Sequence, residues 1–530
     1  MTKNRGTLID RAIGYFDPVR GARRQRARSF MTLTGAYVGA LTSRRQLQSW
    51  ATLPQDADSA LLPDLITLRE RSRDLVRNNP IAGGAIHTAV TNVIGQGLKL
   101  QARPDREVLK MSDGQADEWE GKVEREFRMW AENPSFCDIR KTQNFYDIQE
   151  LVFRQCLENG DVFTLMGREK NKYCPYSLRL QVVEADRVCN KDNLKDGESL
   201  QGGVERNENG APVNYHIMNQ HPGNWLYRAN QSWTIVPAFG EKSGLRNVIH
   251  NYRMIRPGQS RGVPYLAPVI ETLKMLGRYT EAELMGTVVA ALFTVFIKTE
   301  LGAATLQPMQ GDTAVEGQYS SSDKDIKLGN GALIGLRPGE SVETADPKRP
   351  NSAFDAFMKA VLEQVGVALE IPFEILIGHF SASYSASRAA LLEAWRFFRG
   401  RRKWMSMGFC QMVYENFLYE GVALGRIIAP GFFSDALLRM AYCNAIWIGD
   451  APSQIDPLKE VDAAEKRLNL CLTTRDEETV SLTGGDFEAN FPRIKKEKEM
   501  LRSIGVGEEK KEPIAEPTKG KEDEDISEDA

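Results

Sequence analysis

The spacing of apolar residues predicts alternating helices and strands in the first half of the chain. Apolar positions recur every three or four residues in 61–79, 81–93, 117–134 and 144–158, which is the spacing of one helix face. Shorter apolar runs bounded by turn residues predict strands. The predicted strands are Asp161–Arg168, Leu178–Val183, Pro212–Met218 and Trp233–Pro237. The pattern therefore predicts an α+β fold for this half of the chain.

Longer helical patterns dominate the second half. On Ser352–Glu370, Phe354, Phe357 and Val361 share one face, which predicts a helix packed against a neighbour. Residues 377–387 have no regular periodicity and are rich in small side chains, so they are predicted to form a loop. The other predicted helical segments are Pro264–Thr299, Ala386–Tyr419 and 456–505, with a break expected at Gly484-Gly485. A strand is also predicted at about Thr294–Thr299, at the end of the first of these segments.

Charge is nearly balanced over the whole chain but not at its ends. There are 68 Lys and Arg against 71 Asp and Glu, which disfavours a globally basic nucleic-acid binder. Residues 1–53 form a basic arm, interpreted either as a solvated, poorly ordered segment or as one that contacts nucleic acid or a partner. Residues 508–530 are acidic and nearly devoid of apolar residues, so this tail is predicted to be disordered.

Cysteine usage and apolar runs indicate a cytoplasmic product. Seven scattered cysteines without a C-x-x-C pair are typical of free thiols in a reducing compartment. The longest apolar run, Leu284–Ile297, falls short of the roughly 20 residues that span a bilayer. The run is interpreted as a helix buried between protein neighbours, and no contact with a membrane is expected.

One motif could indicate an enzyme. Gly258-Gln-Ser-Arg-Gly262 matches the G-x-S-x-G pattern in which a serine hydrolase would use Ser260 as its nucleophile. That pattern needs a sharp strand-to-helix turn, but Pro257 precedes it and Pro264 delays the next helix. Only His379 among the downstream histidines could act as base. A simple turn is therefore favoured, and the absence of a P-loop or of metal-ligand spacing predicts no catalytic site, metal or cofactor.

Charged residues also fall on defined helix faces. Asp355, Lys359 and Glu363 lie at i, i+4 and i+8 on the helix 352–370, opposite the phenylalanines. On the next long helix, four basic residues fall within about 80° of one another at 100° per residue; they are Arg388, Arg396, Arg399 and Lys403. Each pattern alone is also typical of a solvated face.

Several stretches, read in order from about residue 60 to 505, resemble the portal (head–tail connector) proteins of lambda-like tailed bacteriophages. The resemblance rests on LRERSRDLVRNNP at 68–80, IGQGL at 94–98, the segment YRMIRPGQSRGVPYLAPVI at 252–270, and DPLKE at 456–460. It implies a ring, usually of twelve subunits, at one vertex of the capsid. A structural adaptor outside this family and the serine hydrolase remain as alternatives.

The resemblance implies a division of the chain into the parts of a portal subunit. These are a basic N-terminal arm (1–53), a wing (54–263), a first stem helix (264–299), a clip (300–350), a second stem helix (351–371), a tunnel loop (372–387), a long wing helix and return (388–455), a helical crown (456–507) and a disordered acidic tail (508–530).

The implied function is a channel through which double-stranded DNA is packaged into the procapsid and later ejected. The expected partners are the terminase large subunit, head–tail connector proteins, and the major capsid and scaffold proteins. The protein would lie in the virion, after assembly in the host cytoplasm. Sliding DNA requires weak, screened contacts; the residues expected to face it are Asp355, Lys359, Glu363, His379, Phe380, Tyr384 and Arg388.

Overall fold

The computed structural model divides the chain into two compact units, residues 1–60 and 61–530. The predicted arm (1–53), clip (300–350) and tail (508–530) lie wholly or mostly outside the residues that the structure describes. Those residues are 15, 18–20, 45, 49–50, 52–226, 231–291, 295–299, 340–344, 354–379, 383–452 and 457–503.

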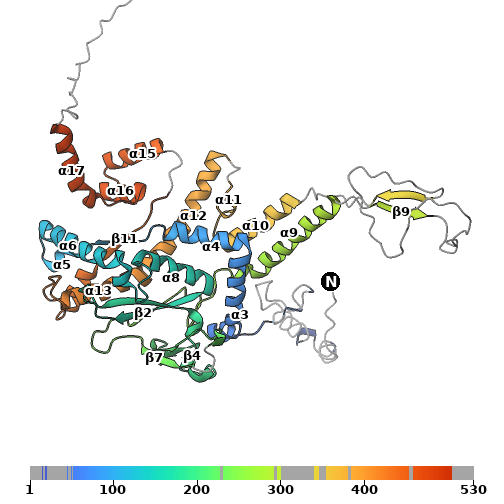
Figure 1. Cartoon of the computed structure of the whole chain (residues 1–530), viewed down its shortest axis with the longest axis horizontal. Helices are drawn as coiled ribbons and strands as arrows, with labels where there is room; N and C mark the ends of the chain where they lie inside the picture. The colour runs from blue at the N-terminus through green and yellow to red at the C-terminus, as the bar shows by residue number, and fades with distance from the viewer. Residues whose placement is uncertain are drawn as a thin grey trace, which may run out of the picture. The chain divides into compact units, whose positions relative to one another are not determined.

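Two consecutive helices, α3 (Ala57–Asn78) and α4 (Pro80–Val93), are separated by a single capping residue (Figure 1). The side-chain oxygen of Asn79 accepts hydrogen bonds from the backbone N–H groups of Ile81 and Ala82, and proline follows at the first helical position, as expected of a helix start. The first helix begins four residues before the predicted range 61–79, so Pro63 lies inside α3.

Helices α6 (Asp113–Glu132) and α8 (Phe145–Asn159) supply the centre of the hydrophobic core. Phe127 of α6 lies edge-on to Phe145 of α8 and to Phe417, with ring centroids 5.5 and 5.1 Å apart. Short turns of helix connect the elements of this region; they are α5 (Arg106–Leu109), α7 (Pro134–Cys137), and the 3₁₀ turns Ala185–Arg187 and Lys191–Asn193.

Among the described residues, the strands form small antiparallel sheets. One sheet has the order β3 (Leu178–Val183), β2 (Asp161–Arg168) and β8 (Val248–Tyr252). Another contains β4 (Leu200–Gln201), β5 (Val204–Arg206), β6 (Pro212–Met218) and β7 (Trp233–Pro237) in that order. All four strands predicted by name are confirmed at both ends.

A two-stranded sheet joins distant parts of the chain. Strand β1 (Lys99–Ala102) pairs with β11 (Ala445–Ile448), with Lys99 opposite Ile448. The chain enters β1 through Gly95 and Gly97, both at positive φ, where glycine is favoured.

Helix α9 (Ile270–Ala291) follows a 3₁₀ turn at Ala267–Val269 and packs against α10 (Phe354–Ala368). The contact is aromatic, because the Tyr279 ring lies 5.7 Å from that of Phe354 and 5.1 Å from that of Phe357. The single helix expected over 264–299 is corrected: it ends at Ala291, and the apolar run continues into β9 (Val295–Thr299), which pairs with β10 (Glu340–Thr344).

The predicted tunnel loop, 372–387, is partly helical. Helix α11 (Phe373–Ile377) occupies its first part, and α12 (Tyr384–Met405) begins before the expected start at residue 386. A π-helical segment, Ser406–Cys410, then joins α12 to α13 (Gln411–Ala423). The remaining helices are α14 (Ala436–Cys443), α15 (Pro457–Asn469), α16 (Arg475–Thr483) and α17 (Phe487–Ser503).

The break predicted at Gly484-Gly485 separates α16 from α17, with Gly484 at φ +66°. A second break, at 470–474, was not expected; it ends at Thr474, which caps α16. None of the described helices combines the length and apolarity needed to cross a membrane.

Candidate functional site

The three charged residues predicted on one face of α10 are exposed, as the helical spacing requires. Lys359 Nζ lies 4.0 Å from Glu363 Oε1 and 5.7 Å from the centre of the Phe373 ring. Such an exposed i,i+4 pair contributes only a few tenths of a kcal/mol. The helix therefore presents Asp355, Lys359 and Glu363 as an accessible row with alternating charge, and their proposed role beside DNA stays a prediction.

The opposite face of α10 is only partly covered. Val365 is buried, but Phe357 is 50% exposed in the single chain. The phenylalanine face was expected to pack against neighbouring subunits, and half of the Phe357 side chain is available for such a contact.

The other predicted channel residues are spread along the chain between α11 and α12. His379 is exposed and follows α11, and its backbone N–H donates to the carbonyl of Glu374 in the first turn of that helix. Tyr384 is the first residue of α12, and Phe380 lies outside the described residues. Arg388 points toward α15, where its guanidinium is 3.9 Å from Glu460. The structure thus pairs Arg388 with α15 rather than with the charged row of α10.

A buried ionic cluster, here called the Asp161 network, brings together the two longest family-like segments of the sequence. Asp161 begins β2 and is completely buried. Arg69, from the 68–80 segment on α3, reaches it at 2.6 Å, and Arg261, from the 252–270 segment, also reaches it at 2.6 Å. His250 of β8 lies 3.1 Å away through Nε2. One carboxylate thus joins α3, β2, β8 and the loop that leads to α9.

Electrostatics keep this carboxylate ionised. Burial by itself would raise the pKa of Asp161, but the guanidinium groups of Arg261 and Arg69 outweigh burial and hold the pKa far below its usual range. Burial lowers the pKa of His250 to about 4, despite its contact with the carboxylate. At neutral pH the network therefore contains one negative and two positive groups, with a neutral imidazole.

The G-x-S-x-G segment serves this network rather than an exposed nucleophile. Ser260 is only 2% exposed, and Arg261 beside it is inserted into the buried cluster. A Cβ on Gly262 would lie 2.0 Å from the carbonyl oxygen of Gly160, so the two backbones touch where these glycines meet. The Gln259 side chain closes the turn by accepting from the Ile255 N–H at 2.9 Å.

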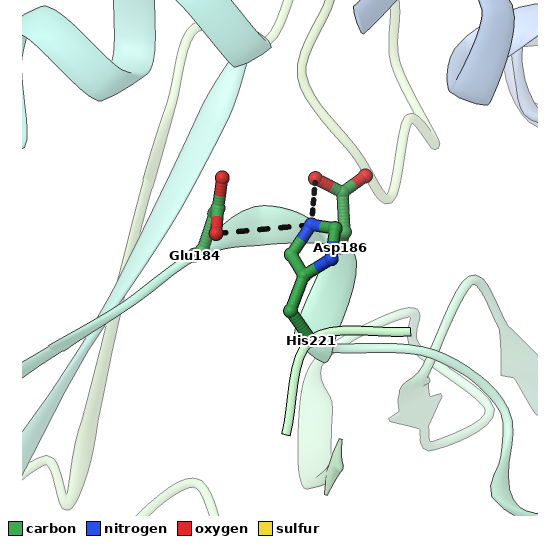
Figure 2. A group of neighbouring side chains, drawn as sticks. All are labelled: Glu184, Asp186 and His221. Carbon is green, nitrogen blue, oxygen red and sulfur yellow. Dashed lines mark ion pairs between the residues drawn. The ribbon is translucent and has the colours of Figure 1, made fainter. Parts of the chain in front are cut away.

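A neighbouring cluster has the composition of a metal site. Glu184, Asp186 and His221 place their ligand atoms within 4.8 Å of one another, and Figure 2 shows the imidazole between the two carboxylates. His221 Nε2 lies 3.4 Å from Asp186 and 3.8 Å from Glu184. Its Nδ1 accepts the Gly223 N–H, so Nε2 carries the proton and has no lone pair to offer a cation.

Arginine also competes for the same oxygens. The Arg73 guanidinium contacts the Asp186 carboxylate and lies 3.5 Å from Glu184. These contacts favour an ion-pair cluster beside the Asp161 network over a cation site.

Sequence reasoning did not single out Asp161, His250 or the Glu184 cluster. One signal was present: Arg69 follows Leu65 by four residues, so it occupies a position on the apolar face of α3. A charged residue in such a position usually needs a buried partner of opposite charge.

The family model described as "Phage portal protein, lambda family" matches residues 43–402. Portal protein B of Escherichia phage lambda is 26% identical over 478 residues, covering 87% of this chain and 89% of that protein. The portal protein of Escherichia phage N15 is 28% identical over 481 residues, with the same two coverages.

Similar solved structures include a chain from the neck of an empty GTA particle computed with C6 symmetry. Its TM-score is 0.45 at 11% identity, covering 83% of this chain and 98% of that one. A chain from the virion of a native gene transfer agent particle has a TM-score of 0.39 at 13% identity, covering 79% and 92%. Because the family model alone matches most of the sequence, the chain belongs to the lambda family of phage portal proteins.

Proposed function

We propose that this portal protein assembles into a closed ring of twelve subunits whose central channel carries double-stranded DNA into the procapsid and out again. The observation that supports a ring is the solvent-exposed apolar surface on two adjoining helices. Large apolar side chains on α9 and α10 are about half exposed or more; they are Met275, Leu284, Met285, Val288, Phe357 and Val367. Repeated contact with further copies would remove this surface from water.

Family membership makes the chain a structural protein and not an enzyme. The role proposed for the ring is then to guide and hold DNA without a high-affinity binding site. In a ring, the exposed row of Asp355, Lys359 and Glu363 would repeat once per subunit as alternating circles of charge. Alternation tempers the attraction for phosphates, so DNA can slide. In this proposal the tunnel loop with His379, Phe380 and Tyr384 adds steric contact.

The clip, 300–350, is proposed to contact the terminase large subunit and the head–tail connector proteins. Its composition, rich in glycine and serine between 302 and 322, suits an adaptable docking segment. The wing and crown would face the major capsid and scaffold proteins. Within this proposal the ring occupies the portal vertex of the virion and forms in the host cytoplasm.

Imaging of the purified chain by negative stain, with sedimentation velocity on the same sample, tests the ring. Closed rings with a central hole wide enough for duplex DNA are expected. A monomer across micromolar concentrations, with salt and magnesium varied, would contradict the proposal.

Charge reversal tests the channel. Lys359→Glu should leave rings intact and impair DNA packaging, because three acidic circles would then line the lumen. Lys495→Glu on the exposed face of α17 is the matched control, expected to package normally. Normal DNA packaging by Lys359→Glu rings would show that α10 does not line the channel.

A further inference from the structure

An acidic groove lies where α10, α11 and α12 meet. It has a volume of about 710 Å³ and is lined by four glutamates, one arginine and several apolar side chains. The glutamates are Glu363, Glu370, Glu374 and Glu393, the arginine is Arg396, and the apolar residues include Val367, Ile371, Phe373 and Phe397. Val367 is 82% exposed, so the groove offers apolar surface that the chain itself does not cover.

The ion pairs that these glutamates already make are open to exchange. Glu370 lies 3.6 Å from Arg253, and Glu393 lies 3.1 Å from Arg396, with both partners of each pair more than half exposed. Pairs of this kind contribute little to stability. Glu374 makes no ion pair within the described part of the chain. The groove therefore carries an excess of negative charge for which an incoming basic segment could compete.

The outward face of α9 has the complementary composition. At 100° per residue, Lys274, Arg278, Glu281, Met285 and Val288 fall within about 80° of one another, and all are exposed. We call this set the α9 stripe. Its first half is basic and its second half is largely apolar.

The cations of the stripe are available for a new contact. Lys274 has only a weak, exposed partner, Asp74 at 3.7 Å. Arg278 forms no ion pair with any described residue. Burying these two side chains at an interface would therefore break only one weak ion pair among the described residues of the subunit.

We infer that the α9 stripe of one subunit docks in the acidic groove of the next copy, an inference that rests on the proposed ring. The two surfaces belong to different helices, and in Figure 1 α10 lies between α9 and α11. A contact between unlike surfaces of identical chains is heterologous, which is the kind that generates a ring when the rotation closes. Of the four glutamates, Glu363 belongs to the charged row proposed to face DNA, so the stripe pairs with Glu370, Glu374 and Glu393. These three carboxylates repel phosphates, so a second copy of the chain is the occupant that fits their charge.

Paired charge reversals test the contact. Lys274→Glu with Arg278→Glu, or separately Glu370→Lys with Glu374→Lys, should each lower the fraction of chain in rings at least tenfold at a concentration where the wild type is mostly ring. All four changes in one chain should restore rings, because every interface then regains opposite charges. Sedimentation velocity measures each fraction, and Lys495→Glu with Lys498→Glu on α17 is the matched control.

Each outcome decides a different point. Loss of rings in both pairs with recovery in the combined variant supports the docking. Rings that persist in either pair, or that fail to return in the combined variant while its circular dichroism and melting temperature stay normal, overturn it. A wild-type chain that forms no ring contradicts the proposed function itself, so the two failures are distinguishable.

Cross-linking gives a second readout that does not depend on ring stability. Arg278→Cys combined with Glu374→Cys should form disulfide-linked oligomers under oxidation, which appear as a ladder on a non-reducing gel. Each single cysteine variant is a control for the native exposed Cys471. A double variant with no ladder beyond its single-variant controls would argue that the stripe and the groove do not meet.

Discussion

Replacement of Asp161 by asparagine would test how much the Asp161 network contributes to the stability of the subunit. The change keeps the shape of the side chain and removes its negative charge. Arg69 and Arg261 would then remain 3% and 2% exposed, with the central carboxylate lost. Removing one partner of a buried ion pair typically costs about 3–5 kcal/mol. We expect a loss in this range, because two cations are left buried together.

Thermal unfolding at pH 7, followed by far-ultraviolet circular dichroism, measures this effect. At about 2.1 cal/mol/K of unfolding entropy per residue, a unit of the size of 61–530 shifts by about 1 °C per kcal/mol, so the midpoint should fall by roughly 3–5 °C. Asp74→Asn, on the same helix as Arg69, is the matched control, since its partner Lys274 is exposed, and it should shift the midpoint by less than about 1 °C.

Two results would refute the reasoning on Asp161. One is an Asp161→Asn midpoint indistinguishable from that of Asp74→Asn. The other is an equally low midpoint when Arg69 and Arg261 are both methionine and Asp161 is leucine. Apolar replacement of the whole cluster removes the uncompensated charges and should recover most of the loss.

Three further predictions concern the wing and its contact with the C-terminal helices. Burial raises the pKa of Glu124 to about 7, against 4.5 unfolded. The contribution of Glu124 to stability should therefore fall by about 2–3 kcal/mol as pH rises from 4.5 to 7, and Glu124→Gln should remove that part of the slope in urea titrations. Gly262→Ala should lower the free energy of unfolding by more than about 3 kcal/mol, because the new Cβ would meet the Gly160 carbonyl. Gly114→Ala is the control, since its Cβ would meet open space, and melting curves compare the two variants. Arg103 lies 3.0 Å from Asp476 and 2.9 Å from Glu488, so Arg103→Ala should speed limited proteolysis within α16 and α17, and an unchanged cleavage rate would contradict this.

Local patterns predicted those elements whose ends are set by neighbouring residues. The Asn79-Pro80 pair marks the start of α4, and turn residues bound β2, β3, β6 and β7. Strand β11 escaped prediction because its four residues are a strand only when paired with β1, more than 300 residues away. Helix α11 escaped because five residues show no helical period.

In the candidate site, too, features set by local spacing could be predicted, and features that depend on distant segments could not. The exposure of Asp355, Lys359 and Glu363 follows from their spacing on one helix, which the sequence contains in full. The burial of Asp161 depends on α3 and on the loop at 261, which come together only in the folded chain. Aspartate at the start of a strand is ordinary in a sequence, so its role could not be predicted.

The Asp161 network also has a consequence for how the chain reaches its folded state during synthesis. Arg69 and Asp161 are 92 positions apart, and Asp161 and Arg261 are a further 100 apart. At about 5–20 residues per second, the ribosome needs roughly 10–40 s after making Arg69 before Arg261 exists to complete the cluster. Until then, burying Arg69 and Asp161 leaves the cluster incomplete, so α3 gains little by docking early. The wing should therefore fold late and cooperatively, which would delay subunit contacts until each chain has passed this step.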